Sequence, residues 1–359
     1  MRREKNYLSA RTLALVLAVA LVAIGLTSLG LGSTSRIGLS ETLQGLLAML
    51  GMAEPLNGSL QTIAELRLYK LGTSVGVGAA LALSGALFQG VFRNQLASPS
   101  IIGVTAGASL GASLMILLIS GSAGSFFLIE RAAGMGPLAI SVAAFLGAAI
   151  TAATVTLLAT TGGRISVPTL LLVGIAINAI VGGAIAAMQR FAVEEADLMR
   201  ALMTWTFGRL DDRSAYHVIT IWIGLAAAIL LIPRVAGELD LFAAGEDDAH
   251  NLGVNTGRVK WSALGAGCLC AALAVSVAGQ IAFVGLITPH ILRRLTGPSH
   301  RSLLWLSLLG GPVLLCGADL AQRLVLGHGA LPPGVVMSLL GGPFFLVLLV
   351  RNRSSVEGW

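Results

Sequence analysis

Charged residues are scarce in this chain of 359 residues: Asp, Glu, Lys and Arg together make up 11%, against about a quarter in a typical soluble domain. Aromatic residues account for only 5%, whereas hydrophobic residues reach 55% and glycine occurs 45 times. A chain so poor in charge cannot cover its surface with polar groups in water, which argues against a soluble enzyme. Small residues let membrane helices pack closely, so the composition predicts one integral membrane domain over residues 1–359.

Cysteine is rare as well. Cys268, Cys270 and Cys316 lie inside apolar runs, and the single residue between the first two is too short a spacer for a zinc or redox motif. We expect all three to be small core residues. His290 follows Pro289 without a nearby cluster of cysteines or carboxylates, and we interpret it as structural. The sequence thus predicts no catalytic residue, no resident metal and no cofactor.

The sequence has no G-x-x-x-x-G-K-[ST] phosphate loop, so ATP binding by that route is not expected. Ionisable groups are few inside the apolar runs, whereas ion-coupled carriers usually keep them near the membrane midplane. Asp319 comes nearest to such a position, but an Asp paired near a helix end is the simpler interpretation. An ion-coupled secondary transporter, the alternative from a different class, is therefore disfavoured. Without ion coupling, uphill transport draws its energy from another polypeptide.

Ten apolar runs approach the length of about 20 residues that a transmembrane helix needs. They lie at about 12–31, 67–92, 100–120, 137–160, 168–189, 214–233, 260–278, 280–295, 302–325 and 334–350. Only Gly279 and Gln280 separate the seventh run from the eighth, so a short or broken helix is expected there. The first run is longer than a signal-peptide core of about 7–15 residues, and we expect it to be a retained span.

Basic residues are unevenly distributed if the N-terminus is placed in the cytoplasm. Ten spans then put the C-terminus on the same side, and fourteen of the 23 Lys and Arg fall inside, while ten of the 17 acidic residues fall outside. Because cytoplasmic loops are enriched in Lys and Arg, both termini are predicted to be cytoplasmic. The net charge of +6 then reflects membrane topology, and no nucleic acid partner is expected.

Five segments carry a family resemblance, in order along the chain. They are Arg67–Pro99, Pro168–Asn178, Gly245–Gly253 (G-x-x-x-A-x-x-L-G), Gly279–Arg301 and Leu331–Phe345. Together they resemble the membrane permease of binding-protein-dependent ABC importers for iron–siderophore complexes, haem and vitamin B12, from about residue 60 onward. Tyr69 and Gln95 replace prolines common in that family, and Lys70 replaces an arginine, which loses the planar guanidinium fork.

The resemblance implies an all-α, polytopic membrane protein with about ten transmembrane helices, in the architecture of type II ABC importer permeases. It implies a location in the bacterial cytoplasmic (inner) membrane and no covalent chemistry. The implied partners are two ABC ATPase subunits, a second permease subunit, either identical or paired, and a periplasmic or lipid-anchored substrate-binding protein. The implied cargo is a ferric siderophore, with cobalamin or haem as alternatives within the family.

The first candidate site is the outer rim. In the family, bases at the positions of Arg67, Lys70 and Arg323 meet acidic side chains on the substrate-binding protein. Arg67 and Lys70 are three residues apart and would share one face at the beginning of a helix. Basic side chains that simply reach toward the membrane interface are the alternative.

The second candidate site is the cytoplasmic loop at about 234–260, which resembles the family's coupling region. There a short helix would bind in a cleft of the ATPase subunit. The acidic residues at the start of this helix would stabilise it, because they lie near its positive N-terminus. A solvated acidic loop is the alternative. The candidate coupling residues are Gly245, Glu246, Asp247, Asp248, Ala249, Leu252 and Gly253.

The third candidate site is the pathway. In relatives the fifth and tenth spans of two permease copies line a central channel; these correspond here to about 168–189 and 334–350. The loop before Pro168, which ends at Val167, matches the family's cytoplasmic gate. Asn178 is the leading polar candidate for the channel lining, although an interhelical hydrogen bond fits it equally well.

Overall fold

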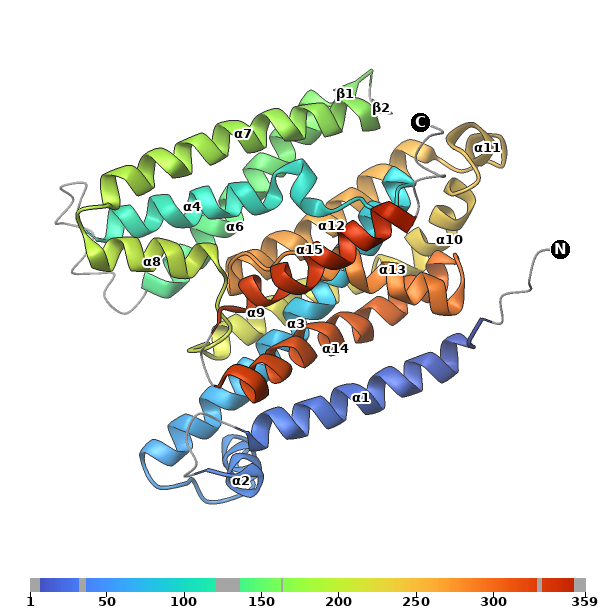
Figure 1. The fold of residues 1–359 in the computed structure, drawn as a ribbon. Coiled ribbons are helices and arrows are strands. Elements are labelled where there is room, and N and C mark those ends of the chain that lie inside the picture. The colour runs from blue at the N-terminus through green and yellow to red at the C-terminus, as the bar shows by residue number, and fades with distance from the viewer. Residues whose placement is uncertain (1–6, 32–36, 121–135, 163, 328–330, 352–359) are drawn as a thin grey trace.

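The computed structural model describes residues 7–31, 37–120, 136–162, 164–327 and 331–351, which form an almost entirely helical bundle (Figure 1). In chain order its elements are α1 (Ala10–Gly30), α2 (Leu39–Met49), α3 (Ser59–Phe92), the 3-10 helix η1 (Pro99–Ile102), α4 (Val104–Ile119), α6 (Gly136–Leu158), β1 (Thr160–Thr161), β2 (Arg164–Ile165), α7 (Val167–Ala192), α8 (Ala196–Thr206), α9 (Ala215–Ile229), α10 (Ile232–Phe242), α11 (Glu246–Asn251), α12 (Thr256–Ala278), α13 (Val284–Thr296), α14 (His300–Leu326) and α15 (Pro333–Arg351). The predicted all-α architecture is confirmed.

Each of the ten predicted spans coincides with a helix or a helix pair. Within the described residues, six helices are long and apolar enough to cross a membrane alone: α1, α3, α6, α7, α12 and α14. The pair α9 and α10 is bent by 55° at its junction and makes a seventh candidate. The shorter apolar helices α4 and α15, with α13 at 13 residues, complete a bundle of about ten membrane helices.

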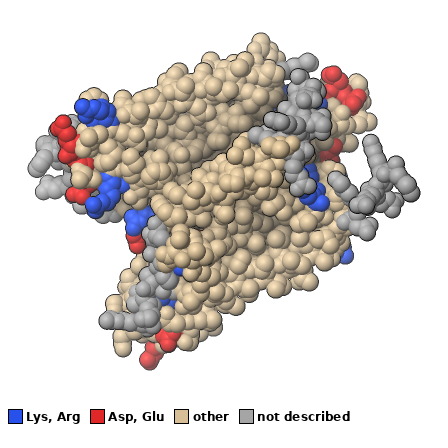
Figure 2. All heavy atoms as spheres, viewed as in Figure 1, with Lys and Arg blue, Asp and Glu red and all other residues tan. Residues whose placement is uncertain are grey.

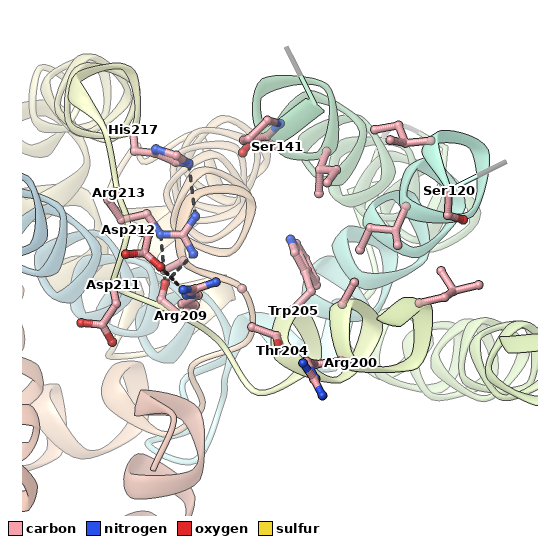
Figure 3. A pocket seen from close by; sticks show the side chains of 18 of the residues that line it. Ser120, Ser141, Arg200, Thr204, Trp205, Arg209, Asp211, Asp212, Arg213 and His217 are labelled. Carbon is pink, nitrogen blue, oxygen red and sulfur yellow. Dashed lines mark hydrogen bonds and ion pairs between the residues drawn. The ribbon is translucent and has the colours of Figure 1, made fainter. Parts of the chain in front are cut away.

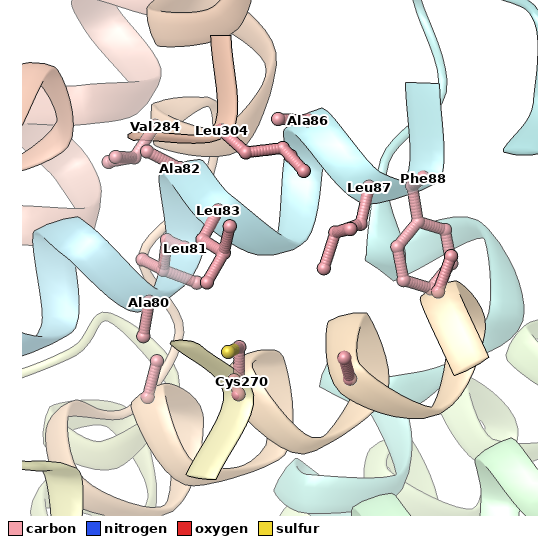
Figure 4. Close-up of a cluster of buried hydrophobic side chains, with 14 of the residues drawn as sticks. Ala80, Leu81, Ala82, Leu83, Ala86, Leu87, Phe88, Cys270, Val284 and Leu304 are labelled. Carbon is pink, nitrogen blue, oxygen red and sulfur yellow. The ribbon is translucent and has the colours of Figure 1, made fainter. Parts of the chain in front are cut away.

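Helix α3 runs through the centre of the bundle, and 94% of its most apolar stretch is buried. Figure 4 shows its side chains from Ala80 to Phe88 among residues of α12, α13 and α14. The backbones of α3 and α13 cross so closely that a Cβ on Gly85 would overlap the carbonyl oxygen of Gly285. Lipid supplies no hydrophobic drive between helices, so this close packing through small residues holds the bundle together.

The three cysteines are free thiols within α12 and α14. Cys270 and Cys316 are buried and Cys268 is half-buried. Figure 4 shows Cys270 facing the side chains of α3. Their predicted role as small core residues is confirmed.

The expected short or broken helix after the seventh span is also confirmed. Helix α12 ends at Ala278, and five residues pass before α13 begins at Val284. Within this break Gly279 (φ 72°) and Phe283 (φ 65°) adopt left-handed backbone conformations. The carbonyl of Ala278 accepts a hydrogen bond of 2.7 Å from the amide of Arg209. A loop before α9 therefore satisfies a carbonyl that the interrupted helix leaves open.

The bundle has two distinct ends. Figure 1 places α2 and α8 at one end, and α11, the β1–β2 hairpin, the start of α1 and the finish of α15 at the other. Charged side chains gather at these ends in Figure 2, with a broad uncharged surface between them. Such a surface suits the hydrocarbon region of a bilayer, where charge is costly. We call the end with α11 the inner end and the opposite one the outer end, following the predicted orientation.

Two predicted boundaries were wrong. Helix α3 begins at Ser59, so Arg67 lies in its third turn and not at the helix start. Helix α10 continues to Phe242, well beyond the sixth predicted span, so the expected loop at 234–260 is partly helical. In α10 this extension is amphipathic: Arg234 is exposed while Val235 beside it is buried. Hydropathy therefore identifies the part of a helix that lies in the hydrocarbon region of the bilayer, and it does not show where the helix begins or ends.

Candidate functional site

The predicted docking bases meet at the outer end, where α1, α3 and α14 converge. One guanidinium nitrogen of Arg67 donates to the carbonyl oxygens of Leu29 and Ile37, each at 2.9 Å. Nη1 of Arg323 donates to the carbonyl oxygen of Leu31 at 3.1 Å. The last carbonyls of a helix have no partner within it, so these two arginines complete the C-terminal end of α1.

A buried carboxylate joins two of these bases. Asp319 is 6% exposed, and its Oδ2 lies 2.8 Å from Nη2 of Arg323 and 3.5 Å from Nζ of Lys70. Lys70 also contacts Oδ1 of Asp211 at 2.6 Å. The interpretation of Asp319 as an Asp paired near a helix end is confirmed. We call Arg67, Lys70, Asp211, Asp319 and Arg323 the outer cluster.

The three predicted bases lie together in the outer cluster, but their side chains point into the protein and not toward solvent. Arg323 is 9% exposed and the side chain of Lys70 is 17% exposed. The more exposed charges nearby are Asp211 at 52%, and Arg209 and Asp212, which form an ion pair of their own. In the sequence analysis these residues contribute only to the charge balance of the two membrane sides. The charged run Arg209-Leu-Asp-Asp-Arg213, in a chain with so little charge, is the sequence feature that indicates them.

Beside this run a cavity of about 670 Å³ opens between α4, α6, α8 and α9. Figure 3 shows Arg200, Trp205, Arg209 and Arg213 arranged around it. Nη2 of Arg213 donates to the carbonyl oxygen of Arg209 at 2.8 Å. Burial lowers the pKa of Arg213 to about 10, because an apolar setting disfavours the charged form, yet the group stays charged at neutral pH. No sequence pattern indicates this cavity, because segments far apart in the chain build it.

The predicted coupling motif forms the short helix α11 at the inner end. Gly245 (φ 150°) precedes it and Gly253 (φ 83°) follows it, so both motif glycines occupy backbone conformations that side chains rarely adopt. Three acids fill the first turn, where the helix dipole favours negative charge. The two glycines and the acids therefore explain why this segment is a helix with sharp turns on either side.

Helix α11 divides the coupling motif into an inward and an outward face. Ala249 is fully buried, and Glu246 is only partly exposed. Asp247 and Asp248 are exposed, and Leu252 is 65% exposed despite its apolar side chain. An exposed leucine next to two carboxylates is a surface that a partner protein can cover. The inward face fixes the helix to the bundle.

Two acidic side chains attach the coupling region to the bundle. Asp240 of α10 accepts from the hydroxyl of Ser299 at 3.0 Å and lies 3.0 Å from Nδ1 of His300, at the start of α14. Glu246 of α11 pairs with the ammonium of Lys260 on α12 at 2.6 Å. Displacing α10 or α11 therefore strains α14 and α12 directly.

The predicted gate loop is a tight β-hairpin. Strand β1 pairs with β2 in antiparallel register, Thr160 opposite Ile165 and Thr161 opposite Arg164. Val167 and Pro168 then open α7, a usual place for proline because its missing N–H would have no helical partner there. The hairpin thus leads directly into the fifth predicted span.

Asn178 lies in the middle of α7, where it makes hydrogen bonds to another segment and also borders a cavity. Its Nδ2 donates to the carbonyl oxygens of Ser100 at 3.0 Å and Ile101 at 3.2 Å. It also lines a cavity of about 370 Å³ with Ser98, Gln280 and other residues of η1 and of the break after α12. The hydrogen bond between segments and the lining position are therefore compatible.

Helices α7 and α15 expose long apolar faces. Only 17% of the apolar stretch of α7 is buried, and Leu172 (70%), Ile175 (62%) and Ile180 (67%) are exposed. On α15, Leu339 and Leu346 are exposed to a similar degree. Lipid or a second membrane subunit can cover such faces. Among the described residues no group of three or more His, Cys, Asp or Glu side chains is placed to hold a metal.

Known proteins share this architecture. The profile of the FecCD transport family matches residues 19–351. A cobalamin import system permease protein, BtuC, of Halobacterium salinarum is 38% identical over 297 residues, covering 81% of this chain and 73% of the relative. The hemin transport system permease protein HmuU of Yersinia pestis is 34% identical over 82% of this chain and 84% of its own. An Fe(3+)-citrate import system permease protein, YfmE, of Bacillus subtilis is 32% identical over 97% of this chain and 96% of the relative.

A solved structure agrees with the sequence relatives. It is described as an inward-facing conformation of a metal-chelate type ABC transporter, and it superimposes with a TM-score of 0.78 at 26% identity, over 95% of this chain and 99% of that one. The chain belongs to the FecCD transport family. It is a multi-pass permease subunit of a type II ABC importer in the inner membrane, and the ATPase of such an importer is a separate subunit.

Proposed function

We propose that this permease works with two ATPase subunits, a second permease copy and a substrate-binding protein, and that it imports ferric siderophores. One observation carries the coupling assignment: α11 buries Ala249 and ties the partly exposed Glu246 to Lys260, while it presents Asp247, Asp248 and Leu252 to the surface. These exposed side chains form the contact with the ATPase. Both chain termini and α11 then lie in the cytoplasm.

The docking of the binding protein is assigned to the outer cluster and the charged run beside it. Arg67, Lys70 and Arg323 hold the outer ends of α1, α3 and α14 together, while Arg209 and Asp211 provide exposed charge. Complementary charge at such a rim raises the association rate and fixes the register more than it adds affinity. Lys70→Gln should therefore slow delivery of cargo while the ATPase stays bound; an unchanged rate of uptake would remove the docking assignment.

A ferric siderophore is the first choice of cargo because the Fe(3+)-citrate permease matches 97% of this chain. The apolar faces of α7 and α15 support a bulky cargo that must not bind tightly, since a wall rich in charge would retain it. Asn178 offers one of the polar groups along this route.

Cobalamin is the second candidate, and identity favours it: two cobalamin or vitamin B12 permeases are each 38% identical to this chain. A ferric siderophore and cobalamin are both chelated metal ions. The same apolar pathway therefore suits either.

Uptake by proteoliposomes decides between these cargoes. The permease is reconstituted with its ATPase subunits, ATP is enclosed, and the binding protein is added outside with radiolabelled ferric siderophores, cobalamin or haem. We expect ATP-dependent accumulation of a ferric siderophore and none by the permease alone. Accumulation of cobalamin only would transfer the assignment to the second candidate, and accumulation by the isolated chain in an ion gradient would refute the ABC mechanism.

A further inference from the structure

Lys260 is a buried cation that the proposed function does not use. It lies in the second turn of α12 and is 4% exposed. Burying an ammonium in a protein is strongly unfavourable unless it gains an opposite charge and hydrogen bonds. A methionine or leucine would fill the same space without that cost. The charge therefore needs a reason beyond packing.

The partners of Lys260 belong to three different elements. Its Nζ lies 2.6 Å from Oε1 of Glu246, the first residue of α11. The same nitrogen donates to the carbonyl oxygen of Ile165, in strand β2, at 3.0 Å. It also lies 5.8 Å from the centre of the Phe242 ring, at the end of α10, within reach of a cation–π contact. One side chain thus binds the coupling helix and the gate hairpin together.

The setting of Lys260 makes this contact a bridge. A cleft of about 830 Å³ at the inner end is lined by the hairpin residues Thr161 and Gly162, by His250 of α11 and the following Gly253, and by Lys260. Because this cleft lies between the β1–β2 hairpin and the α11 region, Lys260 contacts both segments at a place where they do not pack fully against each other.

We propose that Lys260 is the positioning residue that transmits movement of α11 to the β1–β2 hairpin and so to the start of α7. This inference depends on the proposed function, because it takes α11 as the ATPase contact. When the ATPase displaces α11, Glu246 pulls on the ammonium, and the ammonium pulls on the carbonyl of Ile165. Breaking either contact is unfavourable, because it leaves the buried ammonium or the carbonyl of Ile165 without a partner.

Two distances within one chain test the proposal. Spin labels on His250→Cys and Trp305→Cys report the position of α11 against α14, and labels on Thr161→Cys and Trp305→Cys report the position of the hairpin. Residues 161, 250 and 305 are exposed. The native cysteines are replaced first, and distances are measured by pulsed EPR in the assembled transporter, with and without ATP under non-hydrolysing conditions.

Lys260→Met removes the charge at nearly constant length, and Lys260→Arg keeps it. In the unmodified chain and in Lys260→Arg we expect ATP to change both distances. In Lys260→Met we expect ATP still to change the α11 distance, while most of the change in the hairpin distance is lost. Arg258→Met, an exposed base on the same helix, is the matched control and should behave as the unmodified chain.

The outcomes separate this inference from the function it depends on. If Lys260→Met leaves the hairpin response intact, or if Lys260→Arg loses it, the bridge is refuted and the ABC mechanism stands. If ATP moves α11 but not the hairpin in the unmodified chain, the bridge is refuted in the same way. An unmodified α11 that never responds to the ATPase refutes both. Should Lys260→Met not assemble, Glu246→Gln cuts the same link at its partly exposed end and should reduce the hairpin response.

Discussion

Asp319 offers the sharpest test of the outer cluster. The carboxylate is 6% exposed and lies 2.8 Å from Arg323 and 3.5 Å from Lys70. Asp319→Asn keeps the shape and removes the charge, which leaves the buried guanidinium of Arg323 without its counter-charge. Losing one partner of a buried pair usually costs about 3–5 kcal/mol. We expect the lower end, about 3 kcal/mol, because Arg323 retains its hydrogen bonds to Leu31 and Ser28.

Asp211→Asn is the matched control for Asp319→Asn. Asp211 contacts the same Lys70 at 2.6 Å but is 52% exposed, so water replaces the lost partner and we expect a cost of about 0–1 kcal/mol. Both variants are unfolded in mixed micelles of increasing SDS content, with tryptophan fluorescence as the signal. The difference of about 2–3 kcal/mol corresponds to roughly a hundredfold in the unfolding equilibrium. Equal costs for the two variants would refute the assignment of Asp319 as the buried centre of the outer cluster.

Three further predictions follow from the packing and from the exposed faces. Gly85→Leu should abolish the folded protein peak in size-exclusion chromatography, because the new side chain would overlap the backbone at Gly285. Gly183→Leu is the control and should leave the peak unchanged, because a Cβ at Gly183 meets open space. Asp247→Lys with Asp248→Lys should reduce co-purification of the ATPase tenfold or more, by about 1.4 kcal/mol or more; undiminished recovery would contradict the coupling surface. A cysteine at Leu172 should react with a water-soluble maleimide in the assembled transporter if α7 lines the pathway, while a cysteine on the lipid-facing side of α1 should not.

Hydropathy was a good guide to the spans because it measures the property that the bilayer selects. All ten apolar runs became helices, and even the weak junction at Gly279 was recognisable from its Gly-Gln sequence. The short helices α2 and α8 were missed for the same reason: at 11 residues each they do not cross the bilayer. Both helices lie at the outer end. An amphipathic pattern, and not a long apolar run, is the sequence feature that would predict them.

The candidate sites were harder to predict because they depend on which residues meet. The coupling motif has a local signature, and its glycines take the backbone conformations that require glycine. Lys260 was counted only as one more inner base. Its partners Glu246 and Ile165 lie 14 and 95 residues away, and no local pattern indicates that the ammonium is buried between them.

The outer cluster also changes how charge at the rim can act. Arg67, Lys70 and Arg323 looked like three free positive charges, but Asp211 and Asp319 belong to the same group of side chains. Three bases against two carboxylates leave a single excess positive charge, and much of it is directed at the carbonyls that end α1. A single charge near the surface attracts an acidic partner by about 1 kcal/mol at contact in water. Charge at this outer end therefore acts mainly on the association rate and register of the binding protein, while the buried parts of the bases keep the shape of the docking surface fixed.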